Sequence, residues 1–224
     1  MNAAARRFCW YYNVKGRVRY QTAWEWQRSL RCERMVESGR DLPDVLILLE
    51  HQPVYTLGRA SSEEHVKFDL QNPPWDVHRI DRGGEVTYHG PGQVVGYPIV
   101  NLRNHKKDLR WYIRSLEQVI INTLAKYDVE GTRKEGLTGV WNGEQKLAAI
   151  GLGASKWVTM HGFALNVTED LSGFDQIVPC GIKEKSVGCL NRFAPQVTPE
   201  QVRKDLSDCF AEEFSLEMIP FKGT

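Results

Sequence analysis

The residue types best suited to chemistry gather in one glycine-rich segment. Residues 82–93 read Arg-Gly-Gly-Glu-Val-Thr-Tyr-His-Gly-Pro-Gly-Gln. Glycine loses more conformational freedom on folding than other residues, and it is typical of places where the backbone approaches another group closely. Backbone N–H groups in such a loop can line a carbonyl or a phosphate. The glycine spacing fits neither a Walker A loop nor a dinucleotide fingerprint. The plain alternative is a glycine-rich hairpin without a ligand.

Cys180 is a second candidate because of its neighbours. It lies between Pro179 and Gly181, which disfavour both a helix and a central strand at this point. The thiol is therefore predicted to lie on a turn. A cysteine is more often a buried structural residue, and Cys9 and Cys209 fit that role because each falls on an apolar strand or helix face.

Lys146 and two histidines complete the candidates. Lys146 opens an apolar stretch, where a lysine is often an edge residue that keeps its charge in water. In a dry cleft, desolvation would instead lower the pKa of its ammonium group, and the lysine could exchange protons. His89 has open space around it in the glycine-rich segment, whereas His161 fits a core or edge position. No residue cluster has metal-ligand spacing, and no Gly-x-Ser-x-Gly elbow occurs.

The cysteine count indicates a reducing compartment. Five cysteines form an odd number with no CxxC spacing, which fits poorly with a disulfide framework or a zinc ribbon. The first residues contain no apolar signal core. We therefore expect a cytoplasmic location, or a plastid or mitochondrial one if the source is eukaryotic.

The elements that must position these groups mix strands and helices without strict alternation. Strands are predicted at 8–14, 45–50, 77–81, 94–100, 138–142, 146–152 and 157–167. Helices are predicted at 20–38 and 109–127 and after Thr198, which forms a capping box with Gln201. Most of 51–76 and 168–197 is predicted to be loop.

This order of elements favours an α+β fold, with a mixed β-sheet flanked by helices, over a doubly wound parallel sheet. The 224 residues suit a single catalytic domain over 1–224. Residues 195–224, a helix followed by a strand, are a candidate small C-terminal subdomain.

The composition excludes several classes. Apolar residues make up 42% of the chain and charged residues 25%, an ordinary globular composition. Lys and Arg total 29 against 28 Asp and Glu, so the basic excess typical of a nucleic-acid-binding domain is absent. The longest aliphatic run, 45–49, is too short to span a membrane. We therefore expect no nucleic-acid and no membrane partner.

Together, these motifs resemble those of the octanoyltransferases of lipoate biosynthesis. The run at 82–93 matches that family's signature, and the blocks 146–151, 161–166 and 179–182 follow in the family's order. The resemblance extends from about residue 10 to about residue 215. It departs from the family at 186–190, which reads Ser-Val-Gly-Cys-Leu where Val-Thr-Ser-Leu is expected.

The resemblance implies a fold similar to the catalytic domains of biotin and lipoate protein ligases. It also implies an acyltransferase that needs no cofactor. Cys180 would be the acyl-thioester nucleophile and Lys146 its proton partner, with His161 as support. The substrate pocket would be lined by Arg82, Gly83, Gly84, Glu85, Val86, Thr87, Tyr88, His89, Ala149, Ile150, Gly151, Gly162, Phe163 and Ala164.

The implied reaction takes an octanoyl group from octanoyl-acyl carrier protein to a lysine of a lipoyl domain, as the first step of endogenous protein lipoylation. The implied acceptors are the lipoyl domains of 2-oxoacid dehydrogenases and the glycine cleavage H protein, and the enzyme is expected to be a monomer. Two basic patches could dock the acidic carrier protein: Lys106, Lys107, Arg110 and Arg114, or Lys183, Lys185 and Arg192.

Two other functions stay open. An ATP-dependent lipoate or biotin protein ligase on the same scaffold makes an acyl-adenylate and needs no nucleophilic cysteine, so the Pro-Cys-Gly sequence at 179–181 disfavours it. A non-catalytic module that only binds an acylated or lipoylated domain would gain no covalent acyl group.

Overall fold

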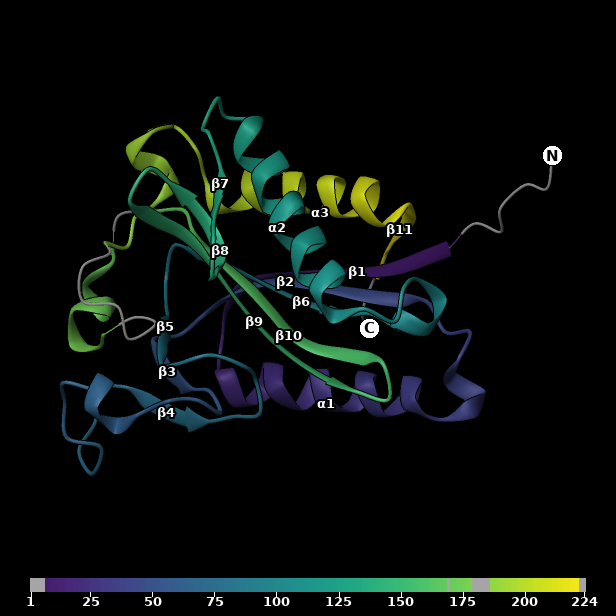
Figure 1. The fold of residues 1–224 in the computed structure, drawn as a ribbon, viewed down its shortest axis with the longest axis horizontal. Coiled ribbons are helices and arrows are strands. Elements are labelled where there is room, and N and C mark those ends of the chain that lie inside the picture. The colour runs from purple at the N-terminus through teal and green to yellow at the C-terminus, as the bar shows by residue number, and fades with distance from the viewer. Residues whose placement is uncertain (1–6, 169, 179–185, 222–224) are drawn as a thin grey trace.

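A mixed eight-stranded sheet forms the centre of the computed structural model, which describes residues 7–168, 170–178 and 186–221 (Figure 1). The strand order is β11-β1-β2-β6-β10-β9-β8-β7. β1 is parallel to β11 and β2, and the other neighbours are antiparallel. The strands are β1 (Arg7–Val18), β2 (Asp44–His51), β6 (Gln93–Ile99), β7 (Thr132–Lys134), β8 (Leu137–Asn142), β9 (Gln145–Ser155), β10 (Val158–Asn166) and β11 (Leu216–Pro220). The predicted α+β class is confirmed.

The continuous apolar run at 45–49 forms β2, which lies inside the sheet between β1 and β6. Leu46 and Leu48 face one hydrophobic cluster, while Ile47 and Leu49 face another. A strand covered on both faces needs apolar side chains at every position rather than at every second one. The sheet therefore has a buried core on each side.

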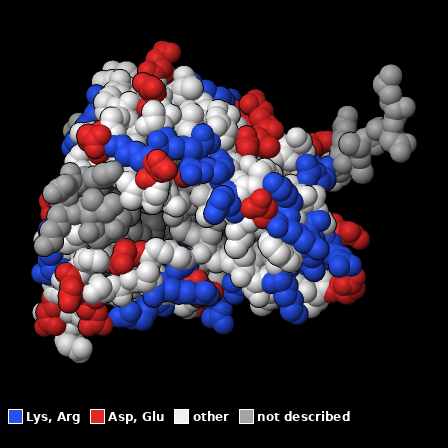
Figure 2. Space-filling view, in the orientation of Figure 1, with Lys and Arg blue, Asp and Glu red and all other residues white. Residues whose placement is uncertain are grey.

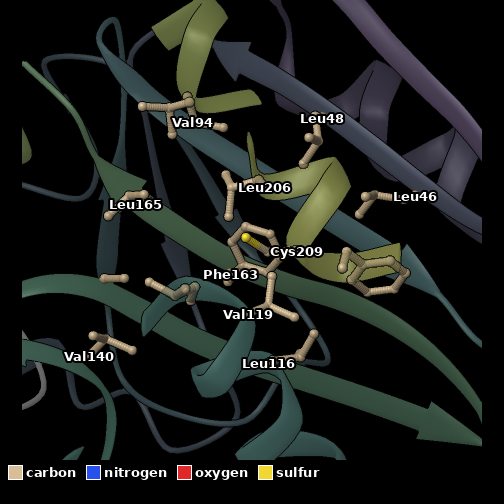
Figure 3. Packing of buried hydrophobic residues seen from close by; sticks show 14 of the residues in the cluster. Leu46, Leu48, Val94, Leu116, Val119, Val140, Phe163, Leu165, Leu206 and Cys209 are labelled. Atoms are coloured by element: carbon tan, nitrogen blue, oxygen red, sulfur yellow. The ribbon is translucent and has the colours of Figure 1, made fainter. Parts of the chain in front are cut away.

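Helices cover the two faces. α2 (Leu109–Ala125) and α3 (Pro199–Phe214) lie on one face, and α1 (Tyr20–Met35) lies on the other (Figure 1). Figure 3 shows the core under α2 and α3, where Leu116, Val119 and Leu206 meet side chains of the sheet. The predicted capping box is confirmed. Thr198 Oγ1 accepts from the backbone N–H of Gln201, and Gln201 Oε1 accepts from the backbone N–H of Thr198.

The last strand, β11, joins the main sheet, and the last helix, α3, packs on it. β11 pairs with β1 in parallel, with Arg7 opposite Leu216. Phe210 and Phe214 of α3 are buried in the same cluster as α2. The C-terminal segment therefore shares the core of the rest of the chain.

A second, three-stranded sheet lies beside the first, in the order β4-β3-β5. Its strands are β3 (Val54–Leu57), β4 (Asp76–Arg79) and β5 (Thr87–His89). β3 is a short strand inside the segment predicted to be mostly loop, and β5 lies within the glycine-rich segment. Short 3-10 helices occur at Glu37–Gly39, Glu63–His65, Leu102–Asn104, Ser172–Gln176 and Leu190–Arg192. Within the described ranges, no helix is both long and apolar enough to cross a membrane.

Candidate active site

Small residues cover the face of β9 and β10 that is turned towards α1. The register pairs Ala149 of β9 with Ala164 of β10, and two residues further along it pairs Gly151 with Gly162. Alternate residues of a strand point to the same face. These four positions therefore form a floor with almost no side chain above it.

The glycine-rich segment forms a roof over this floor. Arg82, only 8% exposed, donates hydrogen bonds to Thr56 O at 2.7 Å and to Thr56 Oγ1 at 3.0 Å. The backbone N–H of Gly83 donates to Leu152 O at 2.8 Å, which ties the roof to β9. Gly84 has a φ of +90°, a backbone conformation that L side chains rarely adopt. Glycine at this position therefore allows the turn.

A pocket lies between roof and floor. Its empty volume, including the open mouth, is about 570 Å³, and a hollow is visible on the face shown in Figure 2. The pocket is lined by Tyr20, Arg82, Gly83, Gly84, Glu85, Val86, Thr87, His89, Val95, Tyr97, Lys146, Ala149, Ile150, Gly151, His161, Gly162, Phe163 and Ala164. Apolar side chains and glycines make up most of this lining, which suits a mostly apolar ligand.

Lys146 lies at one end of this pocket, near the start of β9. Its Nζ is 5.4 Å from the centroid of the Trp141 ring, a cation–π distance. A Cβ at Gly139 would come within 2.6 Å of Lys146 Cε and 2.5 Å of Ala148 O. Glycine at 139, with a φ of +132°, therefore leaves room for the lysine stem.

Cys180 lies outside the described residues, but backbone hydrogen bonds tie the chain on either side of it to the rest of the fold. On the N-terminal side, the backbone N–H of Val178 donates to His65 O at 2.8 Å. On the C-terminal side, the backbone N–H of Lys146 donates to Ser186 O at 3.0 Å. The sequence that resumes after Cys180 thus pairs directly with the candidate lysine.

Two buried histidines in and beside the pocket are neutral. His89 Nδ1 donates to Gln93 Oε1 at 2.7 Å, and burial lowers the pKa of His89 to about 3. His51 Nδ1 donates to Val18 O at 2.9 Å, so its Nε2 accepts from the hydroxyl of Tyr97 at 2.7 Å. Burial lowers the pKa of His51 to about 4. Neither imidazole brings a charge to the pocket at neutral pH.

His161 has a different environment. Its φ of +62° is rare for a non-glycine residue in a strand. Its Nε2 lies 2.9 Å from Asp81 Oδ1, and its backbone N–H donates to Gln27 Oε1. The hydrogen bond from His161 holds the pKa of Asp81 well below its usual range, while burial lowers the pKa of His161. The pair is therefore a neutral imidazole donating to a carboxylate, and the supporting role of His161 stays a prediction.

Tyr88 lies apart from the other predicted pocket residues. In β5, Thr87 and His89 face the pocket, and strand alternation turns Tyr88 to the other side. Its ring packs 5.5 Å from that of Tyr55 and 5.3 Å from that of Trp75. We therefore leave Tyr88 out of the proposed pocket.

Sequence reasoning missed three lining residues, Tyr20, Val95 and Tyr97. Tyr20 begins α1, and the other two lie on a predicted strand, where apolar and aromatic side chains are ordinary core residues. Nothing in the local sequence distinguishes a tyrosine that faces a pocket from one that faces a core.

None of the cysteines among the described residues lines the pocket. Cys9, Cys189 and Cys209 are buried, as expected for Cys9 and Cys209, and Cys32 is exposed. Burial is the main cause that raises the pKa of the Cys9 and Cys209 thiols, which disfavours the thiolate form. Among the described residues, no group of three or more His, Cys, Asp or Glu side chains could hold a metal ion.

Comparison with known proteins agrees with this geometry. Residues 19–211 match the family model of the lipoyl protein ligase A/B catalytic domain. An octanoyltransferase of Synechococcus elongatus is 56% identical over 205 residues, which cover 92% of this chain and 87% of the relative. A chloroplastic octanoyltransferase of Arabidopsis thaliana is 46% identical, with 90% of this chain and 76% of the relative covered.

The fold has solved counterparts. The crystal structure of a lipoate-protein ligase A bound with ATP matches with a TM-score of 0.73 at 16% identity, covering 98% of this chain and 90% of that one. At this identity the match shows the fold alone, and the predicted ligase-like fold is confirmed. The chain therefore belongs to the lipoyl protein ligase A/B catalytic domain family and, within it, to the octanoyltransferases.

Proposed function

We propose that the octanoyl group transferred by this chain passes through a thioester on Cys180, with Lys146 as the proton partner. In the first step, the Cys180 thiolate attacks the carbonyl carbon of an octanoyl thioester. The new bond to Cys180 Sγ forms, the bond to the carrier sulfur breaks, and the carrier thiolate takes a proton from the Lys146 ammonium. Exchange of one thioester for another is close to isoenergetic, so this step needs no nucleotide.

In the second step, the lysine amine of a lipoyl domain attacks the Cys180 thioester. The C–N bond forms, the C–S bond breaks, and the proton lost by the attacking amine returns to the Cys180 sulfur through Lys146. The product is an amide, which is more stable than a thioester, so the step runs downhill. One amine near the sulfur can thus serve both steps.

The observation that carries this proposal is the position of Lys146. It lies at one end of a pocket whose floor is Ala149, Gly151, Gly162 and Ala164, which suits an acyl chain with its carbonyl near the amine. The backbone N–H of Lys146 pairs with Ser186, so the chain that follows Cys180 is in contact with this lysine six residues after the cysteine. Each methylene buried in the pocket would contribute about 0.8 kcal/mol.

The tetrahedral intermediates need hydrogen-bond donors for their oxyanion. The N–H groups of Gly83 and Lys146 are already used, by Leu152 O and Ser186 O. We therefore assign the oxyanion to other donors near Gly84 or along 147–149.

We propose octanoyl-acyl carrier protein as the donor and the lipoyl domains of 2-oxoacid dehydrogenases and the glycine cleavage H protein as acceptors. Lysine and arginine side chains gather above the hollow in Figure 2, with some acidic residues among them. In the first predicted docking patch, Lys106 pairs with Asp108 and Arg114 with Glu117, so part of its charge is neutralised. The second includes Lys183 and Lys185, which lie outside the described residues. The monomeric state and the cytoplasmic location stay predictions.

Intact-mass spectrometry after mixing with octanoyl-acyl carrier protein tests the route. We expect the wild type to gain the mass of one octanoyl group and Cys180→Ala to gain none, while the exposed-cysteine control Cys32→Ala behaves as wild type. Lys146→Ala should lose transfer to a lipoyl domain. Lys134→Ala is its matched control, because Lys134 Nζ lies over the same Trp141 ring, at 5.1 Å.

Octanoyl transfer at the wild-type rate by Cys180→Ala or Lys146→Ala would refute the route. Transfer that instead required free octanoate, ATP and magnesium would favour the ligase alternative. The solved ligases share the fold of this chain, and they support that alternative no further.

A further inference from the structure

The floor of the pocket becomes bulky beyond its two rows of small residues. The next row on the same face pairs Gly153 of β9 with Met160 of β10. Continuing the pairing of Phe163 with Gly96 by three residues brings Ile99 of β6 opposite Met160. Met160 and Ile99 are fully buried in the core under α1. A Cβ at Gly153 would lie 3.3 Å from Asp81 O, so the roof comes down onto the sheet here. The open floor is therefore limited to two rows.

The wall opposite Lys146 is formed by Tyr97. Lys146 is on β9 and Tyr97 on β6, with β10 between them. Two strand spacings correspond to about 10 Å across the sheet, and the row of Tyr97 lies a further five residues, about 16 Å, along β9 from Lys146. Tyr97 is 3% exposed and lines the pocket. One step beyond the pairing of Phe163 with Gly96, the same register sets Tyr97 beside Gly162 and so in the row of Gly151. Because the side chains of Lys146 and Tyr97 both line the pocket, from opposite ends of its floor, an acyl chain whose carbonyl lies near the Lys146 amine would meet this ring at its far end.

Hydrogen bonds hold the ring of Tyr97 in place. Its hydroxyl donates to His51 Nε2 at 2.7 Å, and His51 Nδ1 donates to Val18 O at 2.9 Å at the end of β1. Tyr20 packs beside this relay, with its ring centroid 5.3 Å from that of His51. Because the buried polar atoms satisfy one another, Tyr97 can present its apolar ring to a ligand without leaving a donor unpaired.

We propose that Tyr97, anchored through His51 to β1, sets the length of acyl chain that the enzyme accepts. This inference rests on the proposed placement of the acyl chain in the pocket, but not on the thioester at Cys180. With the tyrosine in place, chains longer than octanoyl meet a fixed ring. With a smaller residue, the slot continues towards His51 and admits additional methylenes.

The test compares kcat/KM for hexanoyl, octanoyl, decanoyl and dodecanoyl thioesters of acyl carrier protein, with a lipoyl domain as acceptor. We expect Tyr97→Ala and the milder Tyr97→Leu to raise the dodecanoyl-to-octanoyl ratio by about tenfold or more, the range expected when pocket space changes by a few methylenes. Tyr97→Phe keeps the ring and should keep the octanoyl preference. Ala149→Val narrows the floor and should shift the preference towards hexanoyl.

The matched control is Tyr112→Ala. Tyr112 is fully buried, but it belongs to the core under α2 and α3. The substitution removes a tyrosine side chain from the opposite face of the sheet, so the dodecanoyl-to-octanoyl ratio of kcat/KM should stay that of the wild type. An unchanged ratio in an active Tyr97→Leu or Tyr97→Ala enzyme would overturn the proposal. A wild-type chain that moves octanoyl without acylation of Cys180 would instead refute the thioester route and leave the wall proposal standing.

Discussion

At the scale of single residues, the pocket has polar side chains in its wall although it is proposed to hold an alkyl chain. His89 lines the pocket and His51 lies behind Tyr97, yet burial keeps both neutral at pH 7. Their hydrogen bonds to Gln93, Val18 and Tyr97 use the polar atoms within the wall. A charged imidazolium in the same place would have to be desolvated by an incoming alkyl chain, at a cost of several kcal/mol.

These histidines predict an acid-sensitive fold. The pKa is about 4 for His51 and about 3 for His89 in the folded chain, against about 6.5 when unfolded. Below pH 6.5 the unfolded chain binds protons that the folded chain does not, so the free energy of unfolding must fall as the pH falls. We expect a slope approaching 1.4 kcal/mol per pH unit for each histidine between about pH 6 and pH 5. Urea unfolding at pH 7, 6 and 5 measures it.

His51→Gln provides the comparison for this slope. It removes one titrating group, so its unfolding free energy should fall less steeply with acid, even if it starts lower because the Tyr97 hydroxyl has lost its partner. Equal slopes for the two proteins would show that His51 titrates alike in the folded and unfolded chains.

The residues found from sequence were those with an unusual local pattern. The glycine-rich segment and Lys146 stand out because glycine and lysine are uncommon in buried strands. Tyr97 could not be found in this way, since a tyrosine in an apolar strand is an ordinary core residue. The role proposed for Tyr97 depends on its position beside Gly151 and Gly162, which lie on two other strands and come next to it only through the register of the sheet.

At the scale of elements, long periodic segments were predictable and short ones were not. The predicted strand at 45–50 and the helix at 109–127 correspond to β2 and α2. β5 and β7 have three residues each and β3 has four, too few to show a period. β5 also lies within a glycine-rich segment whose composition indicates a turn. Its pairing with β3 depends on long-range contacts.

The capping box of α3 predicts a change in stability without a change in chemistry. Thr198→Ala leaves the backbone N–H of Gln201 without its partner, which should cost about 0.5–2 kcal/mol of unfolding free energy. α3 lies on the face away from the pocket, so kcat/KM for octanoyl transfer should not change. Chemical denaturation and transfer assays on the same preparation measure both. Thr198→Ser, which keeps the hydroxyl, should restore most of the lost stability, and a variant as unstable as Thr198→Ala would argue against the cap.

At the scale of the whole molecule, the sheet separates two functions. One face carries the core of α2 and α3, and the other carries α1 and the pocket. The inner strands of the sheet, such as β6 and β10, are hydrogen-bonded to a neighbour on each side. The same backbone hydrogen bonds therefore position the side chains of both faces. Lys146 and Cys180 are 34 positions apart in the sequence, with most of β9 and all of β10 between them. No local pattern encodes a pairing over such a separation, so the two residues could be proposed as partners only through a family resemblance.

The separation of faces predicts that stability and acyl selection can be changed independently. Leu206 of α3 is fully buried in the core shown in Figure 3, and Leu206→Ala should lower the free energy of unfolding by about 2–5 kcal/mol. The dodecanoyl-to-octanoyl ratio should nevertheless stay that of the wild type, because the cavity it leaves is on the other side of β6 and β10. Denaturation and acyl-competition assays below the melting temperature measure the two effects. A ratio that shifted as far as in Tyr97→Leu would mean that the sheet transmits packing defects to the pocket, and that the wall at Tyr97 is positioned by both cores rather than by His51.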